Sequence, residues 1–200
     1  YTLVVSNDLG SVVSQPISVT VGSGATSVLG NVLVWGDNSS GQLGLPIWQT
    51  VPSQMVVPPA NVMFGKKPVS IGAGNSHVVV FADDGKLYAW GGNQSGQLGN
   101  TTTVSSANPV AVKMNGALAG KTVSRISVGG DHTAVLTADG LVYSWGMNDK
   151  GQLGNGTLIN STEPVALSTG TLLAGKTIAG VCAGAKFTLV ATTDGLLYAW

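Results

Sequence analysis

The sequence predicts an all-β chain that forms part of a β-propeller, built from tandem copies of one four-stranded unit. The first observation is a motif, Trp-Gly-x-Asn-x-x-Gly-Gln-Leu-Gly, that begins at Trp35, Trp90 and Trp145. The chain ends on Trp200, so successive anchoring tryptophans all lie 55 residues apart. The second observation is composition, because only 9% of the residues are charged and 29 are glycines. A fixed period of this size indicates one supersecondary unit copied in tandem, each copy burying its apolar face against its neighbours.

Residues 1–21 lie outside the repeat and predict a β-hairpin. Every second residue is apolar or aromatic on either side of a turn at 7–10 (Tyr1, Leu3, Val5 and Ile17, Val19, Val21). This segment resembles the last two strands of an immunoglobulin-like domain, with Tyr1 where the tyrosine corner of such domains lies. We therefore expect 1–21 to be the C-terminal end of an immunoglobulin-like sandwich. Residues 22–27, Gly-Ser-Gly-Ala-Thr-Ser, then read as a flexible linker.

Each period from residue 28 onward can be divided into four strands. In the third unit the expected strands are Val123–Val128, His132–Thr137, 141–145 and 164–167. The second and third are joined by Asp139-Gly140, a pair that suits a tight hairpin because both residues tolerate positive φ. The second strand of each unit is apolar on both faces, as expected for a strand between stacked sheets. Four strands per repeat, packed on copies of themselves, are typical of propeller blades.

The repeated text resembles one family closely. The run Asp-Gly-x-Leu/Val-Tyr-x-Trp-Gly-x-Asn-x-x-Gly-Gln-Leu-Gly, which spans 84–99 and 139–154 with Gly-x-x-His before it, is similar to the regulator-of-chromosome-condensation repeat. The resemblance covers 28–200 and implies a seven-bladed propeller. About three to three and a half blades of the seven would then lie in this chain. The ring cannot close within it, and we expect the chain to be a fragment at both ends.

Residues that recur in every unit are best explained as structural. Tryptophan combines a large apolar body with one N–H and suits the space between blades. Asparagine can bond nearby backbone in the turn that follows, and the glycines supply turn conformations that other residues resist. Phenylalanine replaces the repeat histidine at Phe187, which favours packing over metal ligation or acid–base work. The residues assigned to this frame are Trp35, Trp90, Trp145, Trp200, Asn38, Asn93, Asn148, His77, His132, Gly96, Gly99, Gly151 and Gly154.

Function is then expected where the units differ. The variable positions lie directly after each Trp-Gly, at the turn tips and in the long connections, all of which would form loops on the propeller rims. Trp48 is the one tryptophan off the 55-residue spacing and is the leading candidate for a partner contact, because interface hot spots favour tryptophan. Local packing against Pro46, Pro52 or Met55 is the alternative for Trp48. The candidate contact residues are Trp48, Asp37, Gln94, Met147, Asp149 and Lys150.

Composition excludes several classes of function. Nine basic and nine acidic residues cancel, so the chain has no electrostatic footprint for nucleic acid or an anionic membrane. No apolar run approaches the length that spans a bilayer, so no membrane insertion is expected in this segment. Cys182 is alone and can build neither a disulfide nor a zinc site within the chain; we expect it to be a small buried residue. No catalytic motif is present, so we expect no catalytic residues, no metal and no cofactor.

The leading hypothesis is a non-enzymatic protein-interaction scaffold in a modular secreted or cell-surface protein, of bacterial origin, whose protein partner the sequence does not identify. The low charge and the immunoglobulin-like segment favour that extracellular setting. The resemblance implies an alternative, a guanine-nucleotide exchange factor-like regulator of a small GTPase. The wedge loop and basic surfaces expected of such a factor are not identified in this sequence. It also implies a further alternative, an inhibitor of a secreted enzyme. Light sensing through clustered tryptophans is disfavoured because the tryptophans occupy the ordinary repeat position.

Overall fold

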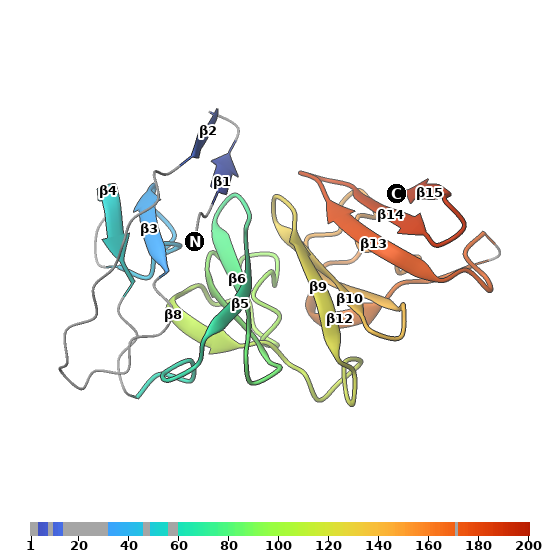
Figure 1. Ribbon diagram of the computed structural model, residues 1–200, viewed down its shortest axis with the longest axis horizontal. Helices are drawn as coiled ribbons and strands as arrows, with labels where there is room; N and C mark the ends of the chain where they lie inside the picture. Colours follow the sequence, from blue (N-terminus) through green and yellow to red (C-terminus); the bar gives the residue numbers. More distant parts are fainter. Residues whose placement is uncertain (1–3, 8–9, 14–31, 46–48, 56–59, 171) are drawn as a thin grey trace.

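The structure, a computed structural model, describes residues 4–7, 10–13, 32–45, 49–55, 60–170 and 172–200. Within these ranges all regular secondary structure is β, and the strands form antiparallel sheets. Figure 1 shows successive sheets standing side by side in sequence order, from the blue hairpin to the red C-terminal sheet. This arrangement confirms the predicted all-β class and the partial propeller.

Two of the sheets are complete four-stranded blades with simple up-and-down order. The second blade and the first have the same strand order and nearly the same spacing. The first consists of β5 (Pro68–Ala73), β6 (His77–Ala82), β7 (Leu87–Gly91) and β8 (Ser106–Ala111). The second consists of β9 (Val123–Val128), β10 (His132–Thr137), β11 (Val142–Gly146) and β12 (Ser161–Ala166).

The remaining strands belong to partial sheets. A three-stranded sheet follows the complete blades, and two-stranded sheets precede them. These strands are β13 (Ile178–Ala183), β14 (Thr188–Thr192) and β15 (Leu197–Ala199), then β3 (Leu33–Gly36) and β4 (Gln49–Gln54), then β1 (Val4–Asn7) and β2 (Gly10–Val13). Each sheet draws its strands from two successive sequence repeats, because a repeat begins at the third strand of one blade.

The predicted strands agree with the observed ones except near the outer edge of each blade. Strands β9 and β10 match residue for residue, and β11 begins one residue later than expected. Strand β12 begins at Ser161, before the predicted start at Pro164, because Ser161 pairs with Gly146 across an irregularity in the register. Pro164 and its counterpart Pro109 lie in the last strand of each sheet, where a missing N–H leaves no central ladder bond unmade.

The hairpin between the second and third strands of each blade forms as the Asp-Gly pairs predict. Gly85, Gly140 and Gly195 have φ of +75°, +78° and +83°, a region that side chains with a Cβ resist. In the first of these turns the Gly85 N–H donates to the Ala82 carbonyl at 3.0 Å. The turns therefore reverse the chain tightly and set the register of the second and third strands.

The hydrophobic core lies between blades as well as within them. One buried cluster combines Val79 and Leu98 of the first complete unit with Val135 and Trp145 of the next. Inner strands of neighbouring blades contact one another, β5 with β9 and β9 with β13. A single blade would leave these apolar faces exposed, so each unit needs its neighbour to bury them.

The N-terminal segment forms a hairpin, but with a shorter second strand than expected. Strand β1 pairs with β2 from Val4 opposite Val13 to Asn7 opposite Gly10. The predicted second-strand residues 17–21, like Tyr1, lie outside the described residues. The division into an immunoglobulin-like end, a linker and repeats therefore stays a prediction.

Cys182 is exposed rather than buried, so the expectation of a buried cysteine is wrong. The preceding repeat shows why the position differs. Its equivalent residue, Ser127, accepts a hydrogen bond from the Ala183 N–H of the next sheet. The face of β13 that carries Cys182 has no further sheet packed on it within the described part of the chain.

Candidate interaction surface on the rim loops

The strands alternate in direction, so the loops of the blades fall on two rims. We call one the Asn-turn rim; it comprises the loops after the third strands, 37–45, 92–105 and 147–160, and the short loops 74–76, 129–131 and 184–187. The opposite rim comprises the Asp-Gly turns 83–86, 138–141 and 193–196 and the connections 112–122 and 167–177. Most of the variable positions of the repeat lie on the Asn-turn rim.

The repeat asparagine organises each long loop from its centre. The Asn148 Oδ1 accepts the Leu153 N–H at 2.9 Å, and its Nδ2 donates to the carbonyls of Thr157 and Ile159 at 2.9 and 3.0 Å. Asn93 makes the same contacts, accepting from Leu98 at 2.9 Å. Both asparagines are fully buried. One side chain thus ties three backbone points together, which fixes the course of the loop.

The repeat tryptophan links each blade to the preceding loop. The Trp90 Nε1–H donates to the Gln42 carbonyl at 2.8 Å, and the Trp145 Nε1–H donates to the Gln97 carbonyl at 2.9 Å. Trp90 and Trp145 are fully buried, whereas Trp35 and Trp200 are half-buried. A buried indole that finds its acceptor one repeat earlier makes the loop and the next blade one packed unit.

The glycine frame permits this close packing. A Cβ added at Gly99 would lie 2.6 Å from the Trp145 Nε1, and one added at Gly96 would lie 2.7 Å from the Thr162 Cα. Both glycines also have positive φ, as do Gly151 and Gly154. Any larger residue at these positions would push the loop away from the next blade.

The repeat histidine makes a contact between blades that the sequence did not indicate. The His132 Nε2 lies 2.9 Å from the Thr188 Oγ1, and the Thr188 hydroxyl donates its proton to the Gln152 carbonyl at 2.8 Å. The Nε2 atom must therefore carry the proton, which leaves His132 Nδ1 buried and without a partner. His77 makes the equivalent contact with Thr133 at 3.1 Å.

Burial keeps both histidines neutral. It lowers the pKa of His77 to about 3, with a smaller contribution from His132. It lowers the pKa of His132 to about 4, although the nearby Asp131 carboxylate opposes the shift. A charged imidazole would lose its hydration without gaining an acceptor for its second N–H.

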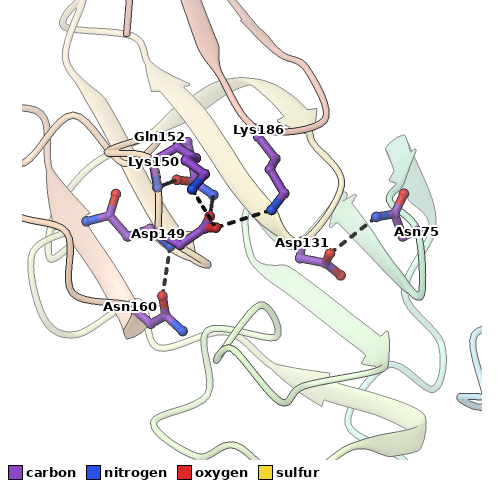
Figure 2. A network of polar contacts seen from close by, with 8 residues as sticks. Asn75, Asp131, Asp149, Lys150, Gln152, Asn160 and Lys186 are labelled. Atoms are coloured by element: carbon purple, nitrogen blue, oxygen red, sulfur yellow. Dashed lines mark hydrogen bonds and ion pairs between the residues drawn. The ribbon is translucent and has the colours of Figure 1, made fainter.

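Two of the candidate contact residues, Asp149 and Lys150, are exposed at one turn tip, where Asp149 meets the next blade (Figure 2). The Asp149 Oδ2 lies 3.2 Å from the Lys186 Nζ and 3.7 Å from the Lys150 Nζ. Hydrogen bonds from Gln152 and Lys186 hold the pKa of the Asp149 carboxyl below its usual range. A second polar contact in Figure 2 joins Asn75 to Asp131 of the neighbouring blade at 3.2 Å.

The other candidates are placed separately. Asp37 is exposed, and its carboxylate accepts from Ser39 and Gln42 within its own turn, which lowers its pKa. Gln94 is exposed at the tip of its turn, and Met147 is half-buried. Trp48 lies outside the described residues. The structure therefore does not bring the six candidates into one site.

Sequence reasoning missed three apolar residues on the same rim. Val104, Leu158 and Ile159 are large hydrophobic side chains that project into solvent from the loops 92–105 and 147–160. Their signal was available, because they stand at variable positions next to a conserved frame of this repeat. It was overlooked because alternation and charge patterns do not single out apolar residues in a loop.

The opposite rim carries a contact that recurs in each described unit. A lysine before the blade pairs with the aspartate of the Asp-Gly turn, as Lys121 does with Asp139 at 2.6 Å. The equivalent pairs are Lys66 with Asp84 and Lys176 with Asp194. The same spacing of 55 residues joins these lysines in the sequence. Recurrence in every unit indicates that the pairs serve the unit.

Comparison with known families settles the type of repeat. The model of the regulator of chromosome condensation (RCC1) repeat matches residues 30–81, 84–136 and 139–191. This chain belongs to the RCC1 repeat family. A second RCC1 repeat model matches residues 69–97 and 123–152.

RCC1 repeats similar to these occur in large proteins of different kinds. The human E3 ubiquitin-protein ligase HERC2 is 31% identical over 179 residues, which is 88% of this chain and 4% of HERC2. The ultraviolet-B receptor UVR8 of Arabidopsis thaliana is 31% identical over 176 residues, covering 88% of this chain and 38% of the receptor. The chain thus spans well under half the length of these relatives.

Solved structures share the fold. Human WBSCR16 superposes with a TM-score of 0.70 at 23% identity, over 83% of this chain and 41% of its own. Yeast RCC1 (Prp20), solved bound to Kap60, superposes with a TM-score of 0.68 at 22% identity, over 86% of this chain and 39% of its own. RCC1-type propeller structure is therefore the shared feature.

No group of three or more potential metal-binding side chains occurs among the residues that the structure describes. In the same part of the chain, no helix is long and apolar enough to cross a membrane.

Proposed function

We propose that this RCC1-repeat chain is a non-enzymatic protein-interaction scaffold that binds a protein partner through the Asn-turn rim. The observation that carries the proposal is the contrast within each loop. Buried, recurring residues such as Asn148 and Gln152 hold the backbone, while the neighbouring tip residues Asp149 and Lys150 vary between units and face solvent. A fixed frame that displays variable side chains is the common arrangement of binding surfaces on repeat proteins.

Order in the free loops favours binding. A loop whose backbone is already fixed by Asn93 or Asn148 loses little conformational freedom when a partner docks. Contacts between blades, such as Lys186 with Asp149, also hold neighbouring loops in register. The rim would then act as one preorganised surface.

The proposed setting is a secreted or cell-surface protein. Two sequence features support it, the low content of charged residues and the resemblance of residues 1–21 to the end of an immunoglobulin-like domain. Finding the chain in the culture medium or on the cell surface of its source would support this setting, and finding it only inside the cell would contradict it.

The second candidate function is regulation of nucleotide exchange on a small GTPase. Family membership supports it, together with a solved structure of yeast Prp20p whose description includes binding to Gsp1p and histones. The test is release of a fluorescent guanine nucleotide from a panel of small GTPases. Accelerated release would favour exchange over the scaffold, and unchanged release across the panel would remove this candidate.

Capture of partners by matched variants tests the scaffold. The full chain, an Asp149→Ala/Lys150→Ala variant on the Asn-turn rim and a Lys121→Ala variant on the opposite rim are immobilised and exposed to the proteins secreted by the source. We expect a protein retained by the full chain and by Lys121→Ala but weakened by the double variant. Equal retention by all three, or no retained protein, would refute binding through the Asn-turn rim.

A further inference from the structure

Val104, Leu158 and Ile159 lie on neighbouring loops of the Asn-turn rim, and we infer that they form a docking row for an extended protein segment with apolar side chains and little net charge. This inference rests on the proposed scaffold function and names the class of partner. No charged or catalytic group is needed, since the row would bind by burying apolar surface.

Exposure is the first observation. The side chains of Val104, Leu158 and Ile159 are 71%, 68% and 74% exposed. Isolated apolar residues are common on protein surfaces, but these three share one rim and occupy only two positions of the repeat. Val104 and Ile159 are 55 residues apart and therefore equivalent, and Leu158 directly precedes Ile159.

The backbone of the row is held from below. The Asn93 Nδ2 donates to the Val104 carbonyl at 3.0 Å, and the Asn148 Nδ2 donates to the Ile159 carbonyl at 3.0 Å. The buried asparagine of each repeat thus fixes the residue from which the apolar side chain projects. A side chain on a fixed backbone loses less freedom on binding than one on a loose loop.

The two loops are joined to each other. The Thr101 N–H donates to the Thr162 carbonyl at 2.8 Å, a bond between the loop that carries Val104 and the strand that follows Ile159. Thr101 adopts φ of +70° to make it, although the next repeat has Gly156 at this position, with φ of +79°. A β-branched residue is strained in this region, and such strain persists only where the surroundings impose it. The row is therefore continuous across two blades.

Charge at the rim argues for an uncharged occupant. The Asp149 carboxylate lies between the ammonium groups of Lys186 and Lys150, and the Asp131 carboxylate accepts from Asn75. These neighbours satisfy one another, so little net field remains to attract a charged segment. An occupant that contacts Val104 and Ile159 must span two blades, which an extended chain does with alternate side chains facing the row.

A random linear peptide library displayed on phage tests the row directly. The library is selected on the immobilised full chain, and the recovered peptides are measured on two variants. Leu158→Asp/Ile159→Asp changes the row. Leu172→Asp is the matched control, because Leu172 is 75% exposed but lies on the opposite rim. The urea midpoint of each variant shows that it is folded.

We expect apolar, weakly charged peptides whose binding falls by about tenfold or more on the double variant, is unchanged on Leu172→Asp and does not depend on salt. Peptides that bind the double variant equally well would overturn the row but leave the scaffold intact. Charged peptides with salt-dependent binding, or no peptides, would also overturn the row. The scaffold itself fails only if the partner capture described above shows no dependence on the Asn-turn rim.

Discussion

Replacing His77 and His132 by glutamine should remove most of the acid sensitivity of this fold at mildly acidic pH. Both imidazoles are fully buried between blades, and each bonds a threonine of the next blade through Nε2. Their Nδ1 atoms face no acceptor or donor. Glutamine can keep a hydrogen bond to the threonine but cannot bind a proton.

The magnitude follows from the difference in proton binding between the folded and unfolded chains. The pKa of each imidazole is about 3 or about 4 in the folded chain, against a model value of 6.5. Below about pH 6.5 the unfolded chain therefore binds protons that the folded chain does not, and the free energy of unfolding falls as pH falls. Between about pH 7.5 and about pH 5 the loss is ~2 kcal/mol per histidine and ~4 kcal/mol for the pair. The aspartates contribute little there because their unfolded pKa lies lower.

Urea unfolding followed by tryptophan fluorescence measures this difference. The free energy of unfolding of the full chain should fall steeply over that pH interval, and that of His77→Gln/His132→Gln should change little. The comparison uses the slope with pH, so a constant loss of stability in the variant does not affect it. An equal slope in both proteins would refute the buried neutral histidines.

Three other predictions concern the frame. Thr101→Gly should raise the free energy of unfolding by about 1 kcal/mol by relieving a positive φ, and Gly156→Thr should lower it by a similar amount, as urea titration can measure. Trp145→Ala should lower it by about 3–5 kcal/mol because the indole is fully buried, and a loss within the error of calorimetry would contradict that packing. Lys121→Met should leave the thermal midpoint nearly unchanged, because the exposed pair with Asp139 is screened by solvent; a large fall would mean that the pair matters more than its exposure suggests.

Much of the fold could be predicted because its signals are local and repeated. Strand β10 is a run of apolar and β-branched residues that ends in Asp139-Gly140, and both its bounds and its turn follow from those residues. Strand β12 was placed too late because its start depends on pairing with Gly146 across an irregular register. That information lies in the partner strand rather than in the residues of β12 themselves.

The contacts between blades could not be predicted from the repeat alone. The ring of His132 reaches Thr188, which is 56 residues away, so the pair joins one repeat position to the next position of the following repeat. Sequence reasoning recognised the recurrence of the histidine but could not supply its partner. The pairing of Lys121 with Asp139 was visible in the spacing of both residues, yet only the fold brings them together.

The rim surface needed the structure for a different reason. Variation between repeats marked the turn tips correctly as exposed, as Asp149 and Lys150 show. It gave no weight to Ile159, because an apolar residue in a long connection is equally consistent with burial. Exposure is decided by the Asn148 contacts that fix the loop backbone, and these form only in the folded blade.

Hydrogen exchange of the indole N–H protons, followed by NMR, tests the central claim that each blade is locked to the preceding repeat. The Trp90 and Trp145 N–H groups are buried and donate to the carbonyls of Gln42 and Gln97. Their exchange should therefore require global unfolding, with a free energy equal to that of the whole chain. Exchange of the Trp145 indole as fast as that of a solvent-exposed tryptophan, under conditions where the chain is folded, would contradict the account.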